Sequence, residues 1–425
     1  MSFETISVVG LGYIGLPTAA AFASKQIKVI GVDVNQSTVD TINRGEIHII
    51  EPELDNYVLR SVQSGYLRAT TVPECADAFL IAVPTPFFPV KNQEEIPQPD
   101  LSYIEAAAKA IAPVLKKGNL VVLESTSPVG ATEQMALWLQ AARPDLVFAE
   151  QGRDNVDVYI AHCPERVLPG QVMRELREND RVIGGITPAC SHKALELYRI
   201  FVEGECVITN VRTAEMAKLT ENASRDVGIA FANELSIICD DLGIDVWELI
   251  SLANRHPRVN ILQPGPGVGG HCIAVDPWFI VSKNPAQAKL IHQARLVNDS
   301  KPNWVMDKVK SVLLDVCTDN PHKNIQDLTL ACLGLSFKAN IDDIRESPAL
   351  KITEILHQEL ACKLISVEPN LKIEHHKFSF EIVDLNTAID LADVILLLVE
   401  HDEFKKIDPE VLKGKRCIDT KGIWF

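Results

Sequence analysis

The sequence lacks the cysteine spacing of a zinc site or of a disulfide framework. Its ten cysteines are scattered, and no two of them form a CxxC pair. We therefore expect reduced thiols in a cytoplasmic protein and no bound metal. An excess of positive charge is also missing, because 41 Lys and Arg residues are outnumbered by 57 Asp and Glu residues, for a net charge of −16. This balance argues against nucleic acid and anionic membranes as partners.

Long apolar runs are absent as well. No stretch approaches the ~20 apolar residues of a membrane-spanning helix. The first four residues lead directly into an apolar run, which leaves no room for a signal peptide. At 425 residues the chain is long enough for two or three domains with substantial cores.

The N-terminal segment has the order of features of a dinucleotide-binding unit. An apolar run at 6–9 leads into the turn Gly10–Gly15 (GLGYIG), an alanine-rich helical stretch at 16–24, and a second apolar run at 28–32 that ends in Asp33. Such a turn brings a pyrophosphate to a helix N-terminus, and the acid binds ribose hydroxyls. Because no arginine accompanies the acid, we expect NAD rather than NADP. The expected cofactor contacts are Gly10, Gly12, Tyr13, Ile14, Gly15 and Asp33.

Two further apolar runs continue this alternation of strands and helices. The run at 78–83 ends at a Pro-Thr-Pro turn that contains Thr85, and the run at 119–123 ends at a Glu-Ser-Thr turn that contains Thr126. Ligands bind at the carboxyl ends of parallel strands in doubly wound folds, so both threonines are expected near the cofactor. A threonine at such a place can also simply cap a helix.

The last third of the chain repeats this pattern, and the middle differs from both ends. Four segments after residue 328 echo four segments of the N-terminal domain in the same order, and Lys338 in the echoed turn suits a phosphate of a second nucleotide. The segment between the two ends has helical spacing, with Lys218, Asn222 and Arg225 on one helix face. We predict an α/β fold of two Rossmann-like doubly wound domains joined by a central helical domain, with boundaries at 1–210, 211–320 and 321–425.

A glycine-rich segment within the helical region presents one cysteine. The segment 264–272 (PGPGVGGHC) has four glycines, so a bound molecule can approach the thiol of Cys272 closely. The alternative is a turn that ends in a buried core cysteine. For the polar helix face, the alternative is a charged surface exposed to water. Because the dinucleotide features accompany them, we interpret both as parts of an active site.

Together these segments resemble the UDP-glucose/GDP-mannose dehydrogenase family over the whole chain. The resemblance rests on the segments 10–15 (GLGYIG), 124–130 (ESTSPVG), 163–170 (CPERVLPG), 214–222 (AEMAKLTEN), 254–260 (NRHPRVN), 267–272 (GVGGHC) and 337–345 (FKANIDDIR). Within the family they are most similar to the branch that acts on acetamido sugars. The resemblance implies oxidation of the C6 hydroxymethyl group of a UDP sugar to a carboxylate, with two NAD and one water.

The resemblance also implies a role for each matching residue. Cys272 is the nucleophile, which forms a thiohemiacetal and then a thioester. Lys218 and Asn222 stabilise the oxyanion, Asp276 helps to activate the hydrolytic water, and Glu165 lies in the loop over the sugar. Arg345 is implied to reach the NAD. The implied substrate contacts are Arg166, Val167, Lys218, Asn222, Arg225, His256, Arg258, Gly269, Phe337, Lys338 and Lys421.

The sequence departs from the glucose branch at two positions. Family members that act on UDP-glucose commonly have serine before the cysteine and lysine before the aspartate, where this chain has His271 and Val275. We interpret His271 as a loop-shaping residue rather than a base. The resemblance implies that the substrate is UDP-N-acetyl-D-mannosamine, which is oxidised to its uronate. The uronate is expected to serve a bacterial surface polysaccharide such as enterobacterial common antigen. The enzyme is expected to be a homodimer.

Other functions stay open at this point. UDP-N-acetylglucosamine and UDP-glucose are alternative substrates for the same reaction. A 3-hydroxyacid dehydrogenase would also join a Rossmann domain to a helical one, but it would need neither Cys272 nor a second nucleotide domain. A nucleotide-sugar binding module without chemistry would not need the set of Lys218, Asn222, Cys272 and Asp276.

Overall fold

The computed structural model describes residues 3–90, 95–150, 155–168, 170–270, 272–371 and 377–424. The chain forms two units. The first contains residues 1–221 and 278–284, and the second contains residues 222–277 and 285–425. His271, interpreted above as a loop-shaping residue, lies outside the described residues.

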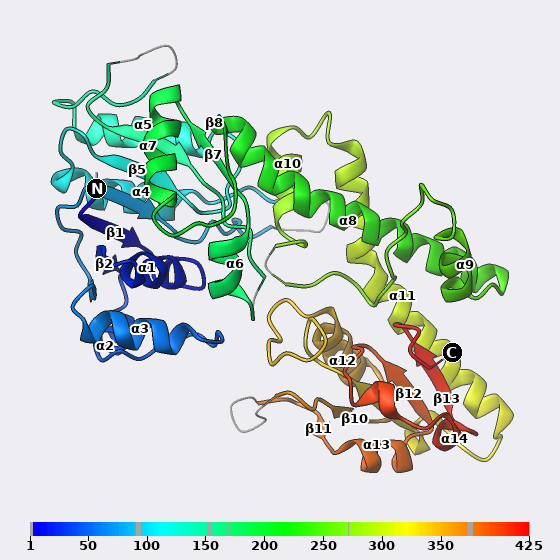
Figure 1. The fold of residues 1–425 in the computed structure, drawn as a ribbon. Helices are drawn as coiled ribbons and strands as arrows, with labels where there is room; N and C mark the ends of the chain where they lie inside the picture. Colours follow the sequence, from blue (N-terminus) through cyan, green and yellow to red (C-terminus); the bar gives the residue numbers. More distant parts are fainter. Residues whose placement is uncertain are drawn as a thin grey trace. The chain divides into compact units, whose positions relative to one another are not determined.

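The first unit is built on an eight-stranded sheet with the order β3-β2-β1-β4-β5-β6-β7-β8 (Figure 1). Neighbouring strands are parallel except β6 and β7, which are antiparallel. The strands are β1 (Thr5–Val9), β2 (Lys28–Val32), β3 (Leu67–Thr70), β4 (Ala78–Ile81), β5 (Leu120–Leu123), β6 (Tyr159–His162), β7 (Arg181–Gly185) and β8 (Cys206–Asn210). The helices are α1 (Gly15–Ser24), α2 (Gln36–Asn43), α3 (Leu54–Gln63), α4 (Ser102–Ile111), α5 (Ala131–Ala142), α6 (Val172–Glu178) and α7 (Pro188–Tyr198).

The central strands of this sheet are buried on both faces. In β4, Leu80 belongs to the core that includes residues of α1, α3 and α6, whereas Phe79 and Ile81 belong to the core that includes residues of α4 and α5. Successive side chains of a strand point to opposite faces, so a strand covered by helices on both sides must be apolar throughout. This explains why the predicted strands read as uninterrupted apolar runs.

Helices dominate the middle of the chain, as predicted. They are α8 (Val211–Leu242), α9 (Val246–Ala253), α10 (Asp276–Lys283) and α11 (Lys289–Asp319). Residues 254–275, between α9 and α10, contain no helix or strand among the described residues and include the glycine-rich segment.

The second sheet confirms the predicted second Rossmann-like unit. Its five strands are parallel, in the order β11-β10-β9-β12-β13. The strands are β9 (Thr329–Leu333), β10 (Lys363–Val367), β11 (Glu381–Ile382), β12 (Val394–Leu397) and β13 (Arg416–Asp419), and the helices are α12 (Pro348–Glu359), α13 (Leu385–Leu391) and α14 (Pro409–Leu412). The order β10-β9-β12-β13 repeats the order β2-β1-β4-β5 of the first sheet.

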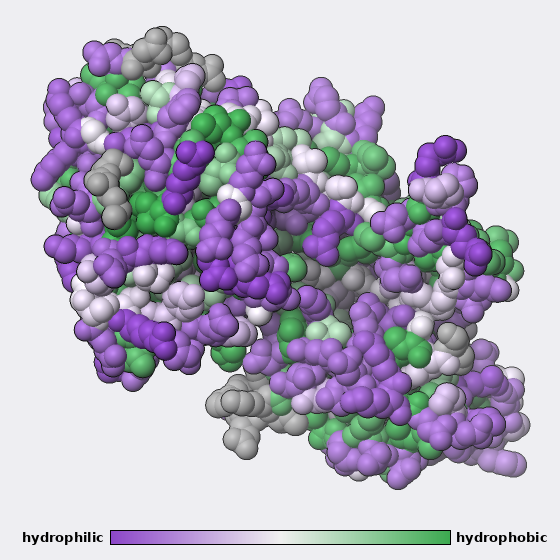
Figure 2. Space-filling view, in the orientation of Figure 1, coloured by the Kyte–Doolittle hydropathy of each residue, from purple (hydrophilic) through white to green (hydrophobic). Residues whose placement is uncertain are grey.

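The face of the molecule seen in Figure 2 is mostly hydrophilic on each unit. Across the described ranges, no helix has both the length and the apolar character needed to cross a membrane. All ten cysteines are free thiols.

Candidate active site

The turn after β1 has the backbone geometry that a pyrophosphate requires. Gly10 has a φ of +92°, and a Cβ on it would lie 2.6 Å from the carbonyl oxygen of Ala82, so only glycine fits. Gly15 begins α1, which starts directly after the turn. Gly12 is exposed, and no atom lies within 4 Å of a Cβ built on it. The backbone at Gly12 is therefore open to an approaching group in front of a helix N-terminus.

Asp33 lies beside this turn. Its carboxylate accepts hydrogen bonds from the backbone N–H of Leu11 at 3.0 Å and of Asn35 at 2.9 Å. The side chain is half-buried, with Ile14 half-buried and Tyr13 exposed in the turn itself. The carboxylate is thus held in place by the turn while part of it stays accessible to ribose hydroxyls.

The turns after β4 and β5 contain the two predicted threonines. A hydrogen bond joins the two turns, because the Ser125 hydroxyl donates to the carbonyl oxygen of Val83 at 2.6 Å. The Oγ1 atom of Thr85 is buried and has no hydrogen-bond partner among the described residues, and Thr126 is half-buried. Buried hydroxyls are almost always paired, so an unpaired one points to a missing ligand group. The open Gly12 backbone, the Asp33 carboxylate and the Thr85 hydroxyl fit a bound dinucleotide.

The polar face of α8 includes a contact to the segment that follows Cys272. Asn222, one turn after the half-buried Lys218, is buried and donates from Nδ2 to Oδ2 of Asp276 at 2.5 Å. Asp276 begins α10, and its backbone N–H donates to the carbonyl oxygen of Cys272 at 2.8 Å. Cys272 itself is exposed. Three of the predicted catalytic residues, Asn222, Cys272 and Asp276, are therefore neighbours.

The glycine segment, residues 264–270, packs against residues predicted to hold the UDP. A Cβ on Gly269 would lie 2.5 Å from the carbonyl oxygen of Glu346 and 3.1 Å from Cβ of Phe337, so the close packing requires glycine. At Gly265, the Lys421 ammonium lies 3.5 Å from the corresponding Cβ position.

Lys421 and Lys338 differ in their surroundings. Burial lowers the pKa of Lys421 to about 8, while the Glu400 carboxylate at 2.6 Å favours its charged form. Lys338 is exposed. Lys338 lies after β9, next to Phe337, and Lys421 lies after β13 of the same sheet.

Glu165 lies in a buried cluster of charged groups that the sequence did not predict. Its side chain is 5% exposed, with Oε1 3.5 Å from Nη1 of the equally buried Arg181. Burial raises the pKa of Glu165, and the positive charges of Arg181 and Lys218 oppose that rise. This carboxyl is therefore not freely solvated, although it lies within the segment 163–170 that was recognised in the sequence.

A second carboxyl shares this cluster. Glu124, at the end of β5, is 2% exposed and accepts a hydrogen bond from the Tyr198 hydroxyl at 2.6 Å. Burial raises the pKa of Glu124 to about 7, against the influence of Arg181 and Tyr198. The adjacent Cys163 thiol is also buried, and burial raises its pKa to about 12, so this cysteine is not a nucleophile at neutral pH.

Another buried network, also not predicted, joins α8 and α11 to the glycine segment. The Arg295 guanidinium lies 2.6 Å from Oδ1 of Asp226, and the Asn298 amide donates to the same oxygen at 2.8 Å. The Asn233 amide donates to Oδ1 of Asn298 at 2.9 Å, and Oδ1 of Asn233 accepts the backbone N–H of Gly265 at 2.9 Å. This chain of hydrogen bonds fixes one end of the glycine segment to two long helices.

The remaining predicted contacts lie outside these groups: Arg166, Val167, Arg225, His256, Arg258 and Arg345. Arg166 pairs with Glu221 at 2.7 Å, and Arg345 pairs with Asp343 at 2.6 Å. Val167 is half-buried against the first core, whereas the other three side chains are exposed. Their roles stay predictions.

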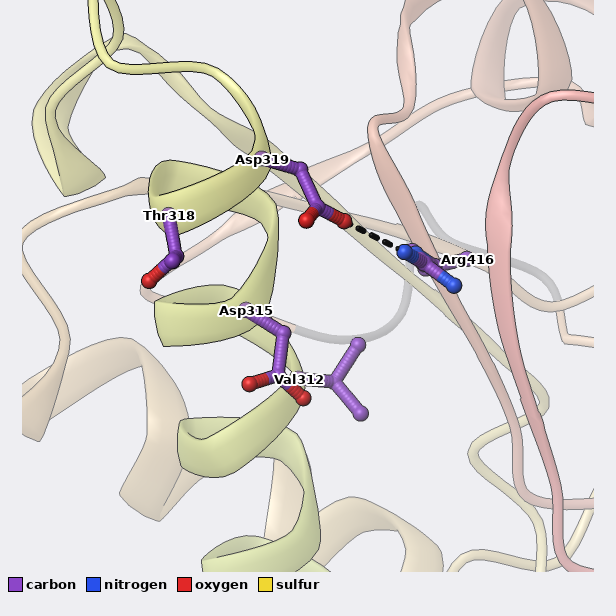
Figure 3. Close-up of a pocket in the computed structure, with 5 residues that line it drawn as sticks. All are labelled: Val312, Asp315, Thr318, Asp319 and Arg416. Atoms are coloured by element: carbon purple, nitrogen blue, oxygen red, sulfur yellow. Dashed lines mark hydrogen bonds and ion pairs between the residues drawn. The ribbon is translucent and has the colours of Figure 1, made fainter.

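A cavity of about 250 Å³ lies elsewhere, between α11 and β13 (Figure 3). An ion pair of 2.5 Å between Asp319 and Arg416 closes one side of it. It is lined by Val312, Asp315, Thr318, Asp319 and Arg416, none of which is a predicted site residue. Within the described ranges, no group of three or more His, Cys, Asp or Glu side chains is arranged to hold a metal ion.

Comparison with known proteins agrees with the two nucleotide sites. The NAD binding domain of the UDP-glucose/GDP-mannose dehydrogenase family matches residues 4–202, its central domain matches 212–300, and its UDP binding domain matches 331–425. The cofactor is therefore NAD, held by the first unit.

Two relatives and one solved structure are similar over almost the entire chain. The UDP-N-acetyl-D-mannosamine dehydrogenase of Yersinia pestis is 63% identical, with 100% of both chains covered. The NDP-N-acetyl-D-galactosaminuronic acid dehydrogenase of Ralstonia nicotianae is 60% identical, with 100% of this chain and 97% of the relative covered. The structure of a UDP-D-ManNAc dehydrogenase from Pyrococcus horikoshii is 38% identical with a TM-score of 0.84, covering 99% of this chain and 96% of that one. This chain belongs to the UDP-glucose/GDP-mannose dehydrogenase family.

Proposed function

We propose that the protein oxidises the C6 hydroxymethyl group of UDP-N-acetyl-D-mannosamine to a carboxylate in two NAD-dependent steps. The observation that carries this proposal is the contact between Asn222 and Asp276 beside the exposed Cys272. A two-electron dehydrogenase of the 3-hydroxyacid type needs no thiol at this place. The relatives named above support the choice of sugar, because the 63% identical one is a UDP-N-acetyl-D-mannosamine dehydrogenase.

When bound at the glycine turn, NAD supplies the hydride acceptor for both oxidations. The first oxidation removes a hydride and a proton from the alcohol and leaves an aldehyde. The Cys272 thiolate then forms a C–S bond to the aldehyde carbon, and this tetrahedral adduct loses the second hydride to give a thioester. Water adds to the thioester carbon, the C–S bond breaks, and the carboxylate and the thiol are released.

The neighbouring side chains suit the charges that develop in these steps. Lys218 and the Asn222 amide are proposed to stabilise the oxyanion of the adduct, with Lys218 also moving protons. The Asp276 carboxylate, which accepts the Asn222 amide, is proposed to help activate the water. Glu165 is proposed to act with them from its buried position next to Arg181.

The second sheet is proposed to bind the UDP. Phe337 offers an apolar ring, and Lys338 and Lys421 offer two ammonium groups for the diphosphate. The other proposed substrate contacts are Arg166, Val167, Arg225, His256, Arg258 and Gly269, and Arg345 is proposed to reach the NAD. The matched family domains support a division near the proposed boundaries of 1–210, 211–320 and 321–425.

Counting NADH released per sugar from a panel of UDP sugars tests the proposal. We expect two NADH per molecule, and the highest kcat/KM with UDP-N-acetylmannosamine. UDP-glucose should be at least ~100-fold poorer, because polar groups that bind an acetamido group would be left unpaired. The panel includes UDP-N-acetylglucosamine and, because of the 60% identical relative, UDP-N-acetylgalactosamine. One NADH per sugar contradicts the four-electron reaction. An equal or higher kcat/KM for UDP-glucose contradicts only the sugar.

A homodimer is part of the proposal. Apolar side chains are exposed at the end of α8 and around α9, with Leu242 63%, Ile244 47% and Leu252 58% exposed, and Figure 2 shows apolar surface next to hydrophilic surface around α9. Such patches mark contact surfaces, and a second copy is the commonest partner. Light scattering should give the mass of a dimer, and a monomeric mass with full activity at high dilution contradicts it.

None of the ten cysteines forms a disulfide, which supports a reducing compartment, so we propose a cytoplasmic location. The uronate product is proposed to supply a bacterial surface polysaccharide such as enterobacterial common antigen.

A further inference from the structure

The turn after β9 is the counterpart of the glycine turn after β1. Strand register establishes this, because Val9 pairs with Val32 and Ile81 in the first sheet, just as Leu333 pairs with Val367 and Leu397 in the second. Gly10 therefore corresponds to Gly334, and their φ values are +92° and +94°.

The same register matches Asp33 with Glu368, and the two acids make the same contact. Asp33 accepts the backbone N–H of Leu11 at 3.0 Å, and Glu368 accepts that of Leu335 at 2.7 Å. Glu368 accepts the N–H of Ser336 as well, at 3.0 Å. Each turn thus begins with a glycine of positive φ, and in each an acid accepts the backbone N–H of the following residue.

Beyond that point the turns differ, and one of the differences lies at the fourth residue after β4 and after β12. The register that matches Ile81 with Leu397 matches Thr85 with His401. Thr85 has a buried hydroxyl without a partner among the described residues, whereas His401, at the matching position of the second sheet, has a fully buried ring that makes hydrogen bonds.

The His401 ring has a hydrogen bond on each nitrogen. Its Nδ1 accepts the backbone N–H of Asn340 at 3.0 Å and lies 2.8 Å from the Asn370 amide nitrogen. Because Nδ1 accepts, the proton of the neutral ring is on Nε2, which donates to Glu368 at 3.2 Å. The ring therefore joins the acid after β10 to the far end of the turn.

These bonds hold residues 334–340, which we call the UDP turn, through the backbone N–H groups of Leu335, Ser336 and Asn340. The Ser336 hydroxyl donates to the carbonyl oxygen of Lys338 at 2.8 Å, and the backbone N–H of Asp402 donates to Asn340 at 3.0 Å. The Lys338 side chain stays exposed. The Phe337 ring lies 3.1 Å from where a Cβ on Gly270 would be, two residues before the catalytic cysteine.

We propose that His401 is a positioning residue that holds the UDP turn so that Phe337 and Lys338 meet the uridine diphosphate of the substrate. The inference rests on the proposed function, which assigns the UDP to these two residues. In the first sheet the Thr85 hydroxyl has no partner among the described residues. In the second sheet His401 hydrogen-bonds to the turn itself, which leaves recognition of the nucleotide to the side chains.

The full-length protein with His401→Leu, His401→Gln or Ser366→Ala tests the proposal. Leucine fills much of the space of the ring without hydrogen bonds, and glutamine keeps one donor and one acceptor. Ser366→Ala is the matched control, since Ser366 is fully buried on β10 and loses one hydrogen bond, to the carbonyl oxygen of Cys332. Calorimetric titration with UDP and with NAD measures both affinities, and steady-state kinetics measure KM and kcat.

We expect His401→Leu to weaken UDP binding about tenfold, the effect of losing a buried hydrogen bond that orders the turn. The KM for the UDP sugar should rise by a similar factor, with a smaller change in kcat and an unchanged affinity for NAD. His401→Gln should recover part of the loss, and Ser366→Ala should bind UDP within about twofold of wild type.

Each outcome separates the inference from the proposed function. Wild-type protein that does not bind UDP overturns the proposed function. Wild-type binding that His401→Leu leaves intact overturns the inference alone, and so does an equal loss of NAD and UDP affinity, which marks general destabilisation. If His401→Leu does not fold, the His401→Gln variant tests the inference. A UDP affinity of His401→Gln that is no weaker than that of the Ser366→Ala control contradicts the role of the ring.

Discussion

Replacing Glu124 by glutamine should make the stability of the first unit less sensitive to pH. Glu124 is 2% exposed and lies in a cluster with Glu165, Cys163, Tyr198 and the guanidinium of Arg181. Two carboxyls with one buried positive charge cannot both be ionised without cost. Glutamine preserves the shape and the acceptor for the Tyr198 hydroxyl but cannot ionise.

The size of the effect follows from the pKa. Burial raises the pKa of Glu124 from an ordinary 4.5 to about 7, and at 1.36 kcal/mol per pH unit this difference amounts to roughly 3 kcal/mol. The sign is destabilising at high pH, because above 4.5 the unfolded chain releases its proton while the folded chain keeps it. The penalty grows from pH 4.5 to about 7 and is constant above that. Between pH 5.5 and pH 8 it grows by about 2 kcal/mol.

Hydrogen exchange at the β5 amides, corrected for intrinsic rates, reports the free energy of opening this region. Measured at pH 5.5 and 8, Glu124→Gln should gain about 2 kcal/mol relative to wild type as the pH rises. The difference between the two proteins cancels the ionisable groups that do not interact with Glu124. Glu74→Gln is the control, since Arg68 holds the pKa of that exposed carboxyl below its usual range and no gain should follow. A gain below about 0.5 kcal/mol for Glu124→Gln would refute the argument.

Three further predictions concern catalysis, cofactor choice and stability. Cys272→Ser should bind NAD normally but yield no uronate, because serine is a poorer nucleophile and its ester a less reactive intermediate; mass spectrometry of the products checks this, and normal acid formation contradicts the thioester route. NADP at the concentration of NAD should give at least a ~10-fold lower rate, because Asp33 would repel the 2′-phosphate, and equal rates of NADH and NADPH production disprove this. Asp226→Ala should destabilise the second unit by about 3–5 kcal/mol in urea unfolding, because it removes the buried carboxylate that pairs with the buried Arg295 guanidinium and leaves the half-exposed Asp299 as its ion-pair partner among the described residues. A loss below about 1 kcal/mol means that the ion pair contributes little.

The parts of the fold that depend on local pattern could be predicted from the sequence. Strands buried on both faces appear as apolar runs, and the glycine turn that follows β1 needs residues at fixed spacing. The sequence also assigned Asn222 and Asp276 to the same active site, because the segments that contain them match a known family. Each of these signals lies within a few consecutive residues.

The buried clusters could not be predicted, because their members come from distant segments. Arg181 begins β7, the one strand that pairs antiparallel to its neighbour β6, and nothing in the sequence around it indicates a partner for Glu165. Similarly, Asp226 and Arg295 lie 69 residues apart on two helices. Helical spacing predicts which residues share a face but not which helix that face will contact.

The two Rossmann-like sheets show why the glycine pattern is complete after β1 and incomplete after β9. In the first sheet the backbone at Gly12 is open and the Thr85 hydroxyl has no partner among the described residues, and both features fit a bound dinucleotide. In the second sheet Glu368 and His401 accept backbone N–H groups of the turn, and Ser336 stands where the first turn has its second glycine. By our proposal a nucleotide there meets side chains rather than open backbone. The loss of the glycine pattern then reflects a different binding mode and does not indicate that nucleotide binding has been lost.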